Sequence, residues 1–295
     1  ASALRAVTRR PFAMNLWLPT GDEILPAEAD LDAARAAVAP LLAAAGVADP
    51  PLPPAFLPDL AEQLDGVWDA APAVLSVVFG VPGAEVVDEA HRRGIRLVGT
   101  ATSVAEAVAL ADGGVDAIVA SGAEAAGHRV SFLRRAEDSL VGTFALVPQV
   151  VDAVDVPVLA AGGIADRRGV AAAFALGAAG VQVGSAFLRT RASAASDAHR
   201  DALRAAADTD TVLTRAMSGR LARGIPNRAV RAIEDADAIA PFPAQNWLTG
   251  VFRAAARDDG ELISLWAGQA AGLSRSDDAD EVFAELAAGL PPASR

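Results

Sequence analysis

The feature that most constrains the fold is an apolar run that recurs six times, each time followed by a stretch of helical character. These runs are continuous and rich in β-branched residues, and they do not alternate between apolar and polar positions. That pattern is typical of strands buried on both faces of a parallel sheet. The predicted strands span residues 12–18, 74–79, 95–99, 117–120, 156–160 and 180–183.

Helix signals lie between these strands. Residues 84–93 form a predicted helix that Gly94 closes. A second predicted helix, 103–112, begins with Ser103 as its N-cap and has Glu106 three places later, which is the pattern of a capping box. The repeating unit is therefore strand, helix, strand, and the chain is predicted to be an α/β protein.

The positions of the glycines distinguish an open sheet from a closed barrel. An open dinucleotide-binding sheet usually carries its Gly-rich loop after the first strand. Here Gly162 and Gly163 follow the fifth apolar run, and Gly184 follows the sixth. A (β/α)8 TIM-type barrel builds its phosphate site after its last two strands. The sequence favours this barrel, and we expect its first two strands to precede residue 1, over about 50 to 60 residues.

The pattern changes after residue 190. We predict a ligand-binding barrel part over 1–190, and a small helical cap with a C-terminal segment that returns to the barrel over 191–295. Residues 211–227 are predicted to be extended. Residues 22–66 are predicted to hold one helix, 31–45, and a Pro-rich linker.

Composition excludes several classes of function. Every basic side chain is Arg and there is no Cys, so lysine Schiff bases, P-loop nucleotide sites and thiol nucleophiles are excluded. The formal charge of −12 argues against nucleic acid as a partner. We predict no metal site. We also predict no membrane segment, because apolar stretches end well short of about 18 residues. A cytoplasmic protein is the default expectation.

One of the three histidines has the setting of a catalytic group. His128 follows a predicted strand in a loop of small residues, where a planar ligand could approach the backbone. Such a position at the active face of a barrel favours a general base. His91 and His199 lie in polar surroundings and are predicted to be solvated surface groups.

The glycine loops form a second candidate site. Gly163 and the Gly184-Ser185 pair would present backbone N–H groups to a phosphate, and the Ser185 hydroxyl would add a donor. The alternative is that AAGG at 160–163 is a tight turn and GAAG at 177–180 a helix cap. Because both loops occur at this spacing, phosphate binding is the favoured interpretation.

Several segments in the same order resemble the nitronate monooxygenase family, formerly called 2-nitropropane dioxygenases, which are FMN-dependent (β/α)8 enzymes. The resemblance covers most of residues 4 to 273. The matching segments are PFAMNLWLP, GAEAAGHR, ALVPQVVDAVDVPVLAAGGIADRRGVAAAFALGAAGVQVGSAFL, LTRAMSGRLARGIPN and LWAGQAAG.

The resemblance implies roles for particular residues. It implies that His128 is the catalytic base and that Asn15 hydrogen-bonds the flavin ring. The other implied FMN contacts are Gly162, Gly163, Gln182, Val183, Gly184 and Ser185. Two further cofactor-site positions depart from the family pattern: Ser121 replaces the common Gln, and Ala126 replaces a Gly. Ala126 would restrict the backbone only if its φ had to be positive.

The implied activity is oxidation of alkyl nitronates, such as propionate 3-nitronate, and of nitroalkanes, with O2 to carbonyl compounds and nitrite. The expected partners are the small-molecule substrate and O2, and the chain could form a homodimer. Two alternatives remain open at this point. One is an FMN-dependent NAD(P)H reductase of the enoyl-acyl-carrier-protein or quinone type, and the other is an inactive flavin-binding protein.

Overall fold

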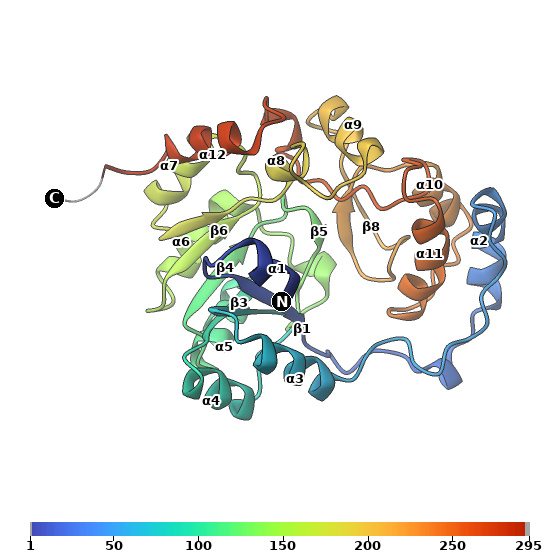
Figure 1. Ribbon diagram of the computed structural model, residues 1–295, viewed down its shortest axis with the longest axis horizontal. Helices are drawn as coiled ribbons and strands as arrows, with labels where there is room; N and C mark the ends of the chain where they lie inside the picture. Colours follow the sequence, from blue (N-terminus) through green and yellow to red (C-terminus); the bar gives the residue numbers. More distant parts are fainter. Residues whose placement is uncertain (1, 293–295) are drawn as a thin grey trace.

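The computed structural model describes residues 2–292, and its centre is a six-stranded parallel sheet (Figure 1). The strands lie in the order β1-β2-β3-β4-β6-β7, so that strands next to one another in this sheet also follow one another along the chain. All six predicted strands are confirmed. They are β1 (Ala13–Trp17), β2 (Val74–Val78), β3 (Arg96–Ala101), β4 (Ala117–Ser121), β6 (Val158–Ala161) and β7 (Gly180–Gln182).

The continuous apolar pattern of the strands has the cause that we expected. Leu75, Leu97, Ile118 and Ala160 each expose 0% of their surface and join one large core. Helices pack on the sheet between successive strands, as a parallel connection requires. They are α3 (Leu60–Ala70), α4 (Ala84–Arg92), α5 (Val104–Asp112), α6 (Thr143–Val151) and α7 (Arg167–Ala175).

The prediction of a single helix in residues 22–66 was wrong. Besides α2 (Asp32–Ala44), helix α3 starts within that range. The Asp59 side chain caps α3 by accepting hydrogen bonds from the N–H groups of Ala61 and Glu62. The Pro-rich residues just before Asp59 obscured this start signal, although Asp is a favoured N-cap residue.

The cap of α5 also differs in part from the capping box that we predicted. Ser103 accepts from the Glu106 N–H at 3.3 Å, as expected. The Glu106 carboxylate, however, accepts from the N–H and hydroxyl of Thr102, both at 2.7 Å, and from the Phe132 N–H at 2.7 Å. This fully buried carboxylate therefore fastens the segment after His128 to the start of α5.

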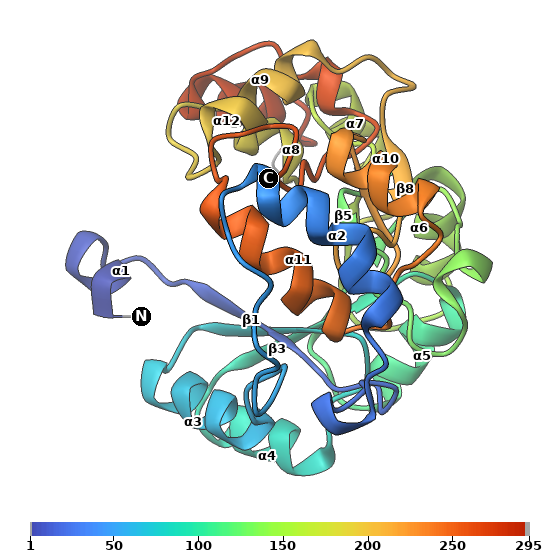
Figure 2. The ribbon, with the colours of Figure 1, turned by 90° about the vertical axis from the view of Figure 1, so that its right-hand side faces the viewer.

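A second core lies beside the sheet. Helix α2 packs against α10 (Arg228–Asp235) and α11 (Ala244–Ala255), and Figure 2 shows α2 alongside α11. Val38, Ile233, Leu248 and Phe252 are completely buried there. Hydrophobic contacts thus tie a helix from the early part of the chain to the helical part predicted after residue 190.

A small antiparallel sheet joins the two cores. It consists of β5 (Gly127–His128), β9 (Ala222–Gly224) and β8 (Val212–Thr214), in that order. The predicted extended character of residues 211–227 is thereby confirmed. The pairing of β5 with β9 places His128 opposite Ala222.

The remaining elements are short. They are α1 (Ser2–Val7), α8 (Ser185–Leu188), α9 (Asp197–Ala205), α12 (Ala279–Ala287) and the 3-10 turns η1 (Pro26–Glu28), η2 (Ala136–Asp138) and η3 (Ala271–Leu273). None of the helices within residues 2–292 has both the length and the apolar character needed to cross a membrane.

Candidate active site

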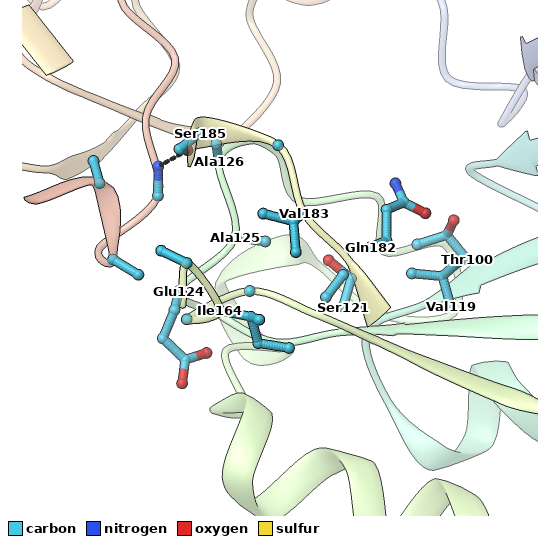
Figure 3. A pocket seen from close by; sticks show the side chains of 18 of the residues that line it. Thr100, Val119, Ser121, Glu124, Ala125, Ala126, Ile164, Gln182, Val183 and Ser185 are labelled. Carbon is cyan, nitrogen blue, oxygen red and sulfur yellow. Dashed lines mark hydrogen bonds between the residues drawn. The ribbon is translucent and has the colours of Figure 1, made fainter. Parts of the chain in front are cut away.

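A cavity of about 240 Å³ lies at the carboxyl ends of β4, β6 and β7 (Figure 3). Nine of the ten site residues that we predicted from the sequence line this cavity. These are Ser121, Ala126, His128, Gly162, Gly163, Gln182, Val183, Gly184 and Ser185. The carboxyl ends of parallel strands are where α/β proteins hold their ligands, so this cavity is the candidate active site.

Asn15 is the one selected residue that the structure does not bring to this cavity. Its amide nitrogen on β1 donates a hydrogen bond to Ser76 Oγ of β2 at 2.8 Å, and the side chain is exposed. In this arrangement Asn15 links the first two strands of the sheet.

The two glycine loops form a cradle of backbone donors. Among the residues that the structure describes, none accepts a hydrogen bond from the N–H of Gly163, Gly184 or Ser185. A Cβ added at Gly184 would meet no atom within 4 Å, so open space adjoins this position. Free N–H groups beside open space fit an anionic oxygen such as that of a phosphate.

The Gly162-Gly163 pair also serves as a tight turn. Both residues have positive φ, 99° and 73°, which glycine adopts without strain. A Cβ on Gly162 would approach the backbone nitrogen of Ala125 to 2.9 Å. The turn and the cradle are therefore one structure, and the two interpretations of these glycines are compatible.

The Ser185 hydroxyl has a defined partner. Its oxygen accepts a hydrogen bond from the N–H of Gly268 at 2.9 Å, drawn as the dashed line in Figure 3. The hydroxyl hydrogen remains available for a ligand, because the bond to Gly268 uses only an oxygen lone pair. This contact also brings the segment around Gly268 to the wall of the cavity.

The two departures from the family pattern, Ser121 and Ala126, do not strain the backbone. Ala126 is not among the described residues with positive φ, whereas the next residue, Gly127, has a φ of 72°. Ser121 is buried, and its carbonyl accepts a hydrogen bond from Arg129 Nη2 at 2.9 Å. Arg129 Nη1 also donates to Gly122 O at 2.6 Å, so a buried guanidinium holds this loop in shape.

His128 lies in an aromatic enclosure at one side of the cavity. The centroids of the Trp17, Trp266 and Phe79 rings lie 4.9, 5.5 and 6.4 Å from that of the imidazole. Its Nε2 is 2.7 Å from Ser218 Oγ.

This environment keeps the imidazole uncharged. Burial, with a smaller effect of two nearby guanidinium groups, Arg220 and Arg253, lowers the pKa of His128 to about 4. At neutral pH the ring is therefore neutral, which is the form that can accept a proton.

The prediction that His91 and His199 are solvated was right for His91 and wrong for His199. His91 is exposed, and its Nε2 lies 3.1 Å from Asp116 Oδ2. His199, predicted to be solvated, is buried on α9, and its Nε2 donates to the carbonyl of Trp266 at 3.0 Å. The surrounding sequence is polar, but α9 turns this face inward against the segment that carries Trp266.

Several residues that line the site were not predicted from the sequence. Glu124 lines the cavity, and its carboxylate accepts hydrogen bonds from the N–H and hydroxyl of Thr143, both at 2.9 Å. In Figure 3, Thr100 and Val119 lie at the end of the cavity away from Ser185. Glu124 stands inside the GAEAAGHR segment, so the resemblance could have drawn attention to it.

Comparisons with known proteins show the family of this chain. The family model described as nitronate monooxygenase matches residues 2–289. The probable nitronate monooxygenase of Staphylococcus aureus strain Newman is 38% identical over 287 residues, which cover 96% of this chain and 80% of that protein.

Two solved structures are also similar. Nitroalkane oxidase from Streptomyces ansochromogenes superposes with a TM-score of 0.83 at 34% identity, over 98% of this chain and 82% of the other. FabK from Thermotoga maritima gives a TM-score of 0.71 at 27% identity, over 97% and 78%. The chain belongs to the nitronate monooxygenase family and is a flavin-dependent oxidoreductase.

Proposed function

We propose that the chain binds FMN and oxidises alkyl nitronates, such as propionate 3-nitronate, and nitroalkanes with O2 to carbonyl compounds and nitrite. The observation that carries this proposal is that the N–H groups of Gly163, Gly184 and Ser185, which have no acceptor among residues 2–292, share one cavity with His128. An anion cradle and a neutral base in one space suit a phosphate-bearing cofactor and a substrate that loses a proton from carbon.

The cradle favours FMN over FAD. Its donors come from two neighbouring loops and form one site, which matches the single phosphate of FMN. The pyrophosphate and adenosine of FAD would need further donors. Gln182 and Val183, at the end of β7, would contact the ribityl chain, and Ser121 and Ala126 would lie near the flavin.

His128 would act on the substrate. Its neutral imidazole would take the proton from the carbon beside the nitro group of a nitroalkane. A nitronate is already an anion and needs no such step, so His128 would then only orient it. Bound FMN would supply the one-electron exchange with substrate and with dioxygen.

We also propose that the six parallel strands are part of a (β/α)8 barrel, with residues 1–190 as the FMN-binding part and residues 191–295 as a helical cap and a C-terminal segment that returns to the barrel. The superposition on Streptomyces nitroalkane oxidase supports the barrel. The contacts of α2 with α10 and α11 add an early helix to the cap.

A pair of substitutions at Gly184 tests the cofactor site. Gly184→Asp places a carboxylate beside the cradle, and Gly184→Asn has nearly the same shape without the charge. Neither side chain should disturb the fold, because nothing lies within 4 Å of the added Cβ. We expect the Asp variant to bind FMN at least about tenfold more weakly than the Asn variant, measured by quenching of FMN fluorescence. Equal affinities would place the phosphate elsewhere.

Anaerobic mixing with NADH distinguishes a nitronate monooxygenase from the alternative, an NAD(P)H reductase. A nitronate monooxygenase should keep its flavin oxidised on the timescale of turnover, while propionate 3-nitronate should reduce it. Rapid bleaching of the flavin by NADH, without reaction with the nitronate, would replace our proposal with a reductase.

A further inference from the structure

The segment LTRAMSGRLARG is one of those that resemble the family. It contains none of the proposed FMN contacts and not the proposed base. In the structure it forms β8, a turn and β9, and the turn places Ser218 against the catalytic histidine. Ser218 is only 2% exposed, and its Oγ is 2.7 Å from His128 Nε2. His128 Nδ1 has no hydrogen-bond partner among residues 2–292, and the ring lines the cavity.

The surroundings of Ser218 decide which atom carries the shared proton. Its Oγ lies 3.1 Å from the Arg220 carbonyl, which can only accept, and 3.2 Å from the Arg220 N–H, which can only donate. A serine hydroxyl has one hydrogen and two lone pairs. If the hydrogen goes to the Arg220 carbonyl, both lone pairs accept, one from the Arg220 N–H and one from His128 Nε2–H.

The opposite arrangement leaves one buried group without a partner. If Ser218 donated to an unprotonated Nε2, the Arg220 carbonyl would lose its donor. A hydrogen on Nδ1 would face the cavity, where solvent accepts it, so the unfavourable term is the Arg220 carbonyl. Unpaired polar groups in a buried site are costly, so the first arrangement is the stable one.

The turn that carries Ser218 is held from outside the sheet. Helix α11 anchors it through Gln245, which donates to Ala216 O at 2.7 Å, and Thr249, which donates to Met217 O at 2.5 Å. Gly219 has a φ of 83°, and a Cβ there would come within 2.5 Å of the Phe242 nitrogen. The hydroxyl position is therefore fixed by packing between the cap and the small sheet.

We infer that Ser218 is a positioning residue that holds His128 in the tautomer with hydrogen on Nε2, which leaves Nδ1 as the atom that takes the substrate proton. This inference rests on the proposed function for the identity of the base. The tautomer itself depends only on the contacts of Ser218 and can be measured without turnover.

The first test is ¹⁵N NMR of the FMN-equilibrated, full-length protein at neutral to slightly alkaline pH. Long-range ¹H–¹⁵N correlations give the tautomer of each of the three histidines, and His128→Asn identifies the signals of His128. His199 is an internal reference, because its Nε2 faces the Trp266 carbonyl and must carry hydrogen. We expect His128 to show the same tautomer, and a hydrogen on Nδ1 would overturn the inference.

The second test compares Ser218→Ala with Ser218→Thr. The Ala variant should give a mixture of His128 tautomers, and the Thr variant, which keeps a hydroxyl, should retain the wild-type signals. We expect kcat for a neutral nitroalkane to fall about tenfold in the Ala variant, and turnover of the nitronate to change less. An unchanged tautomer in the Ala variant would show that Ser218 does not set it.

The two tests separate this inference from the proposed function. If wild-type protein oxidises neither substrate but shows Nε2–H on His128, and Ser218→Ala changes that tautomer, the proposed function fails and the role of Ser218 stands. If turnover is present and the tautomer is Nδ1–H, the role of Ser218 fails and the proposed function stands.

Discussion

The charge state of His128 links its surroundings to its chemistry. Three aromatic rings surround the imidazole, and its Nε2 lies within hydrogen-bond distance of the Ser218 hydroxyl. Because the pKa is lowered to about 4, the base stays unprotonated over the whole neutral range. Such a group is ready to accept a proton, but it binds that proton weakly, so the proton would have to pass on to solvent before the next turnover.

Replacement of His128 should affect the turnover of nitroalkanes and of nitronates differently. Asn keeps a polar side chain of smaller but comparable bulk, so His128→Asn should fold and retain FMN. We expect its kcat/KM for a neutral nitroalkane to fall about 10²- to 10⁴-fold, because a general base is lost. Turnover of the preformed nitronate should fall much less. Equal losses on both substrates would assign His128 to binding, and no loss on either would make it structural.

The lowered pKa also predicts how stability depends on pH. Between about pH 6.5 and 4 the unfolded chain binds a proton on His128 that the folded chain does not. Stability should therefore fall as pH decreases through this window. Burial lowers the pKa of His199 as well, so the wild-type slope contains both groups.

The measurement is the free energy of unfolding in urea at several pH values for the wild type and for His128→Asn. The variant should show a smaller loss of stability between pH 6.5 and 4. Identical slopes would mean that His128 titrates at its ordinary pKa in the folded protein.

At the scale of elements, the site depends on loops that are held together by buried or half-buried charged side chains. Glu106 ties α5 to the segment that follows β5, and Arg129 ties the same segment to the end of β4. Glu124 joins the loop after β4 to the start of α6 through Thr143. Each carboxylate accepts several N–H or O–H groups, so neither could be replaced by an apolar side chain without unpaired donors.

Glu106→Gln tests how much the hydrogen bonds of the Glu106 carboxylate contribute to stability. The neutral amide would point an NH2 group at donors that now face a carboxylate, so we expect a loss of about 2 to 4 kcal/mol in the free energy of unfolding. Glu234→Gln on α10 is the control, because Glu234 is exposed and its change should cost less than about 0.5 kcal/mol. A loss in Glu106→Gln no larger than in the control would show that these hydrogen bonds contribute little to stability.

The sequence could predict the elements whose causes are local. The six strands follow from continuous apolar runs, and the glycine cradle follows from two loops at the ends of strands. The pairing of His128 with Ala222 and the contact with Ser218 join residues about 90 positions apart, so no local pattern encodes them. The burial of His199 was missed for the same reason, since its partner Trp266 is 67 residues away.

At the scale of the whole molecule, two hydrophobic cores meet at the site. The sheet supplies the cradle and the loop before His128, and the cap supplies the turn with Ser218 and the anchors on α11. Arg220 adds contacts between segments far apart in the chain: its guanidinium stacks on Phe79 and Phe242, 4.3 and 4.0 Å from their ring centroids, and pairs with Glu23 at 2.7 Å. The relative position of the two cores therefore sets the geometry of the base.

The most direct measurement is nitrite release from propionate 3-nitronate in air by protein loaded with FMN, together with chromatography of the flavin set free on denaturation. We predict nitrite formation that requires both FMN and O2, and a released flavin that elutes as FMN. A folded protein that takes up FMN but forms no nitrite, or one whose released flavin is FAD, would contradict the account.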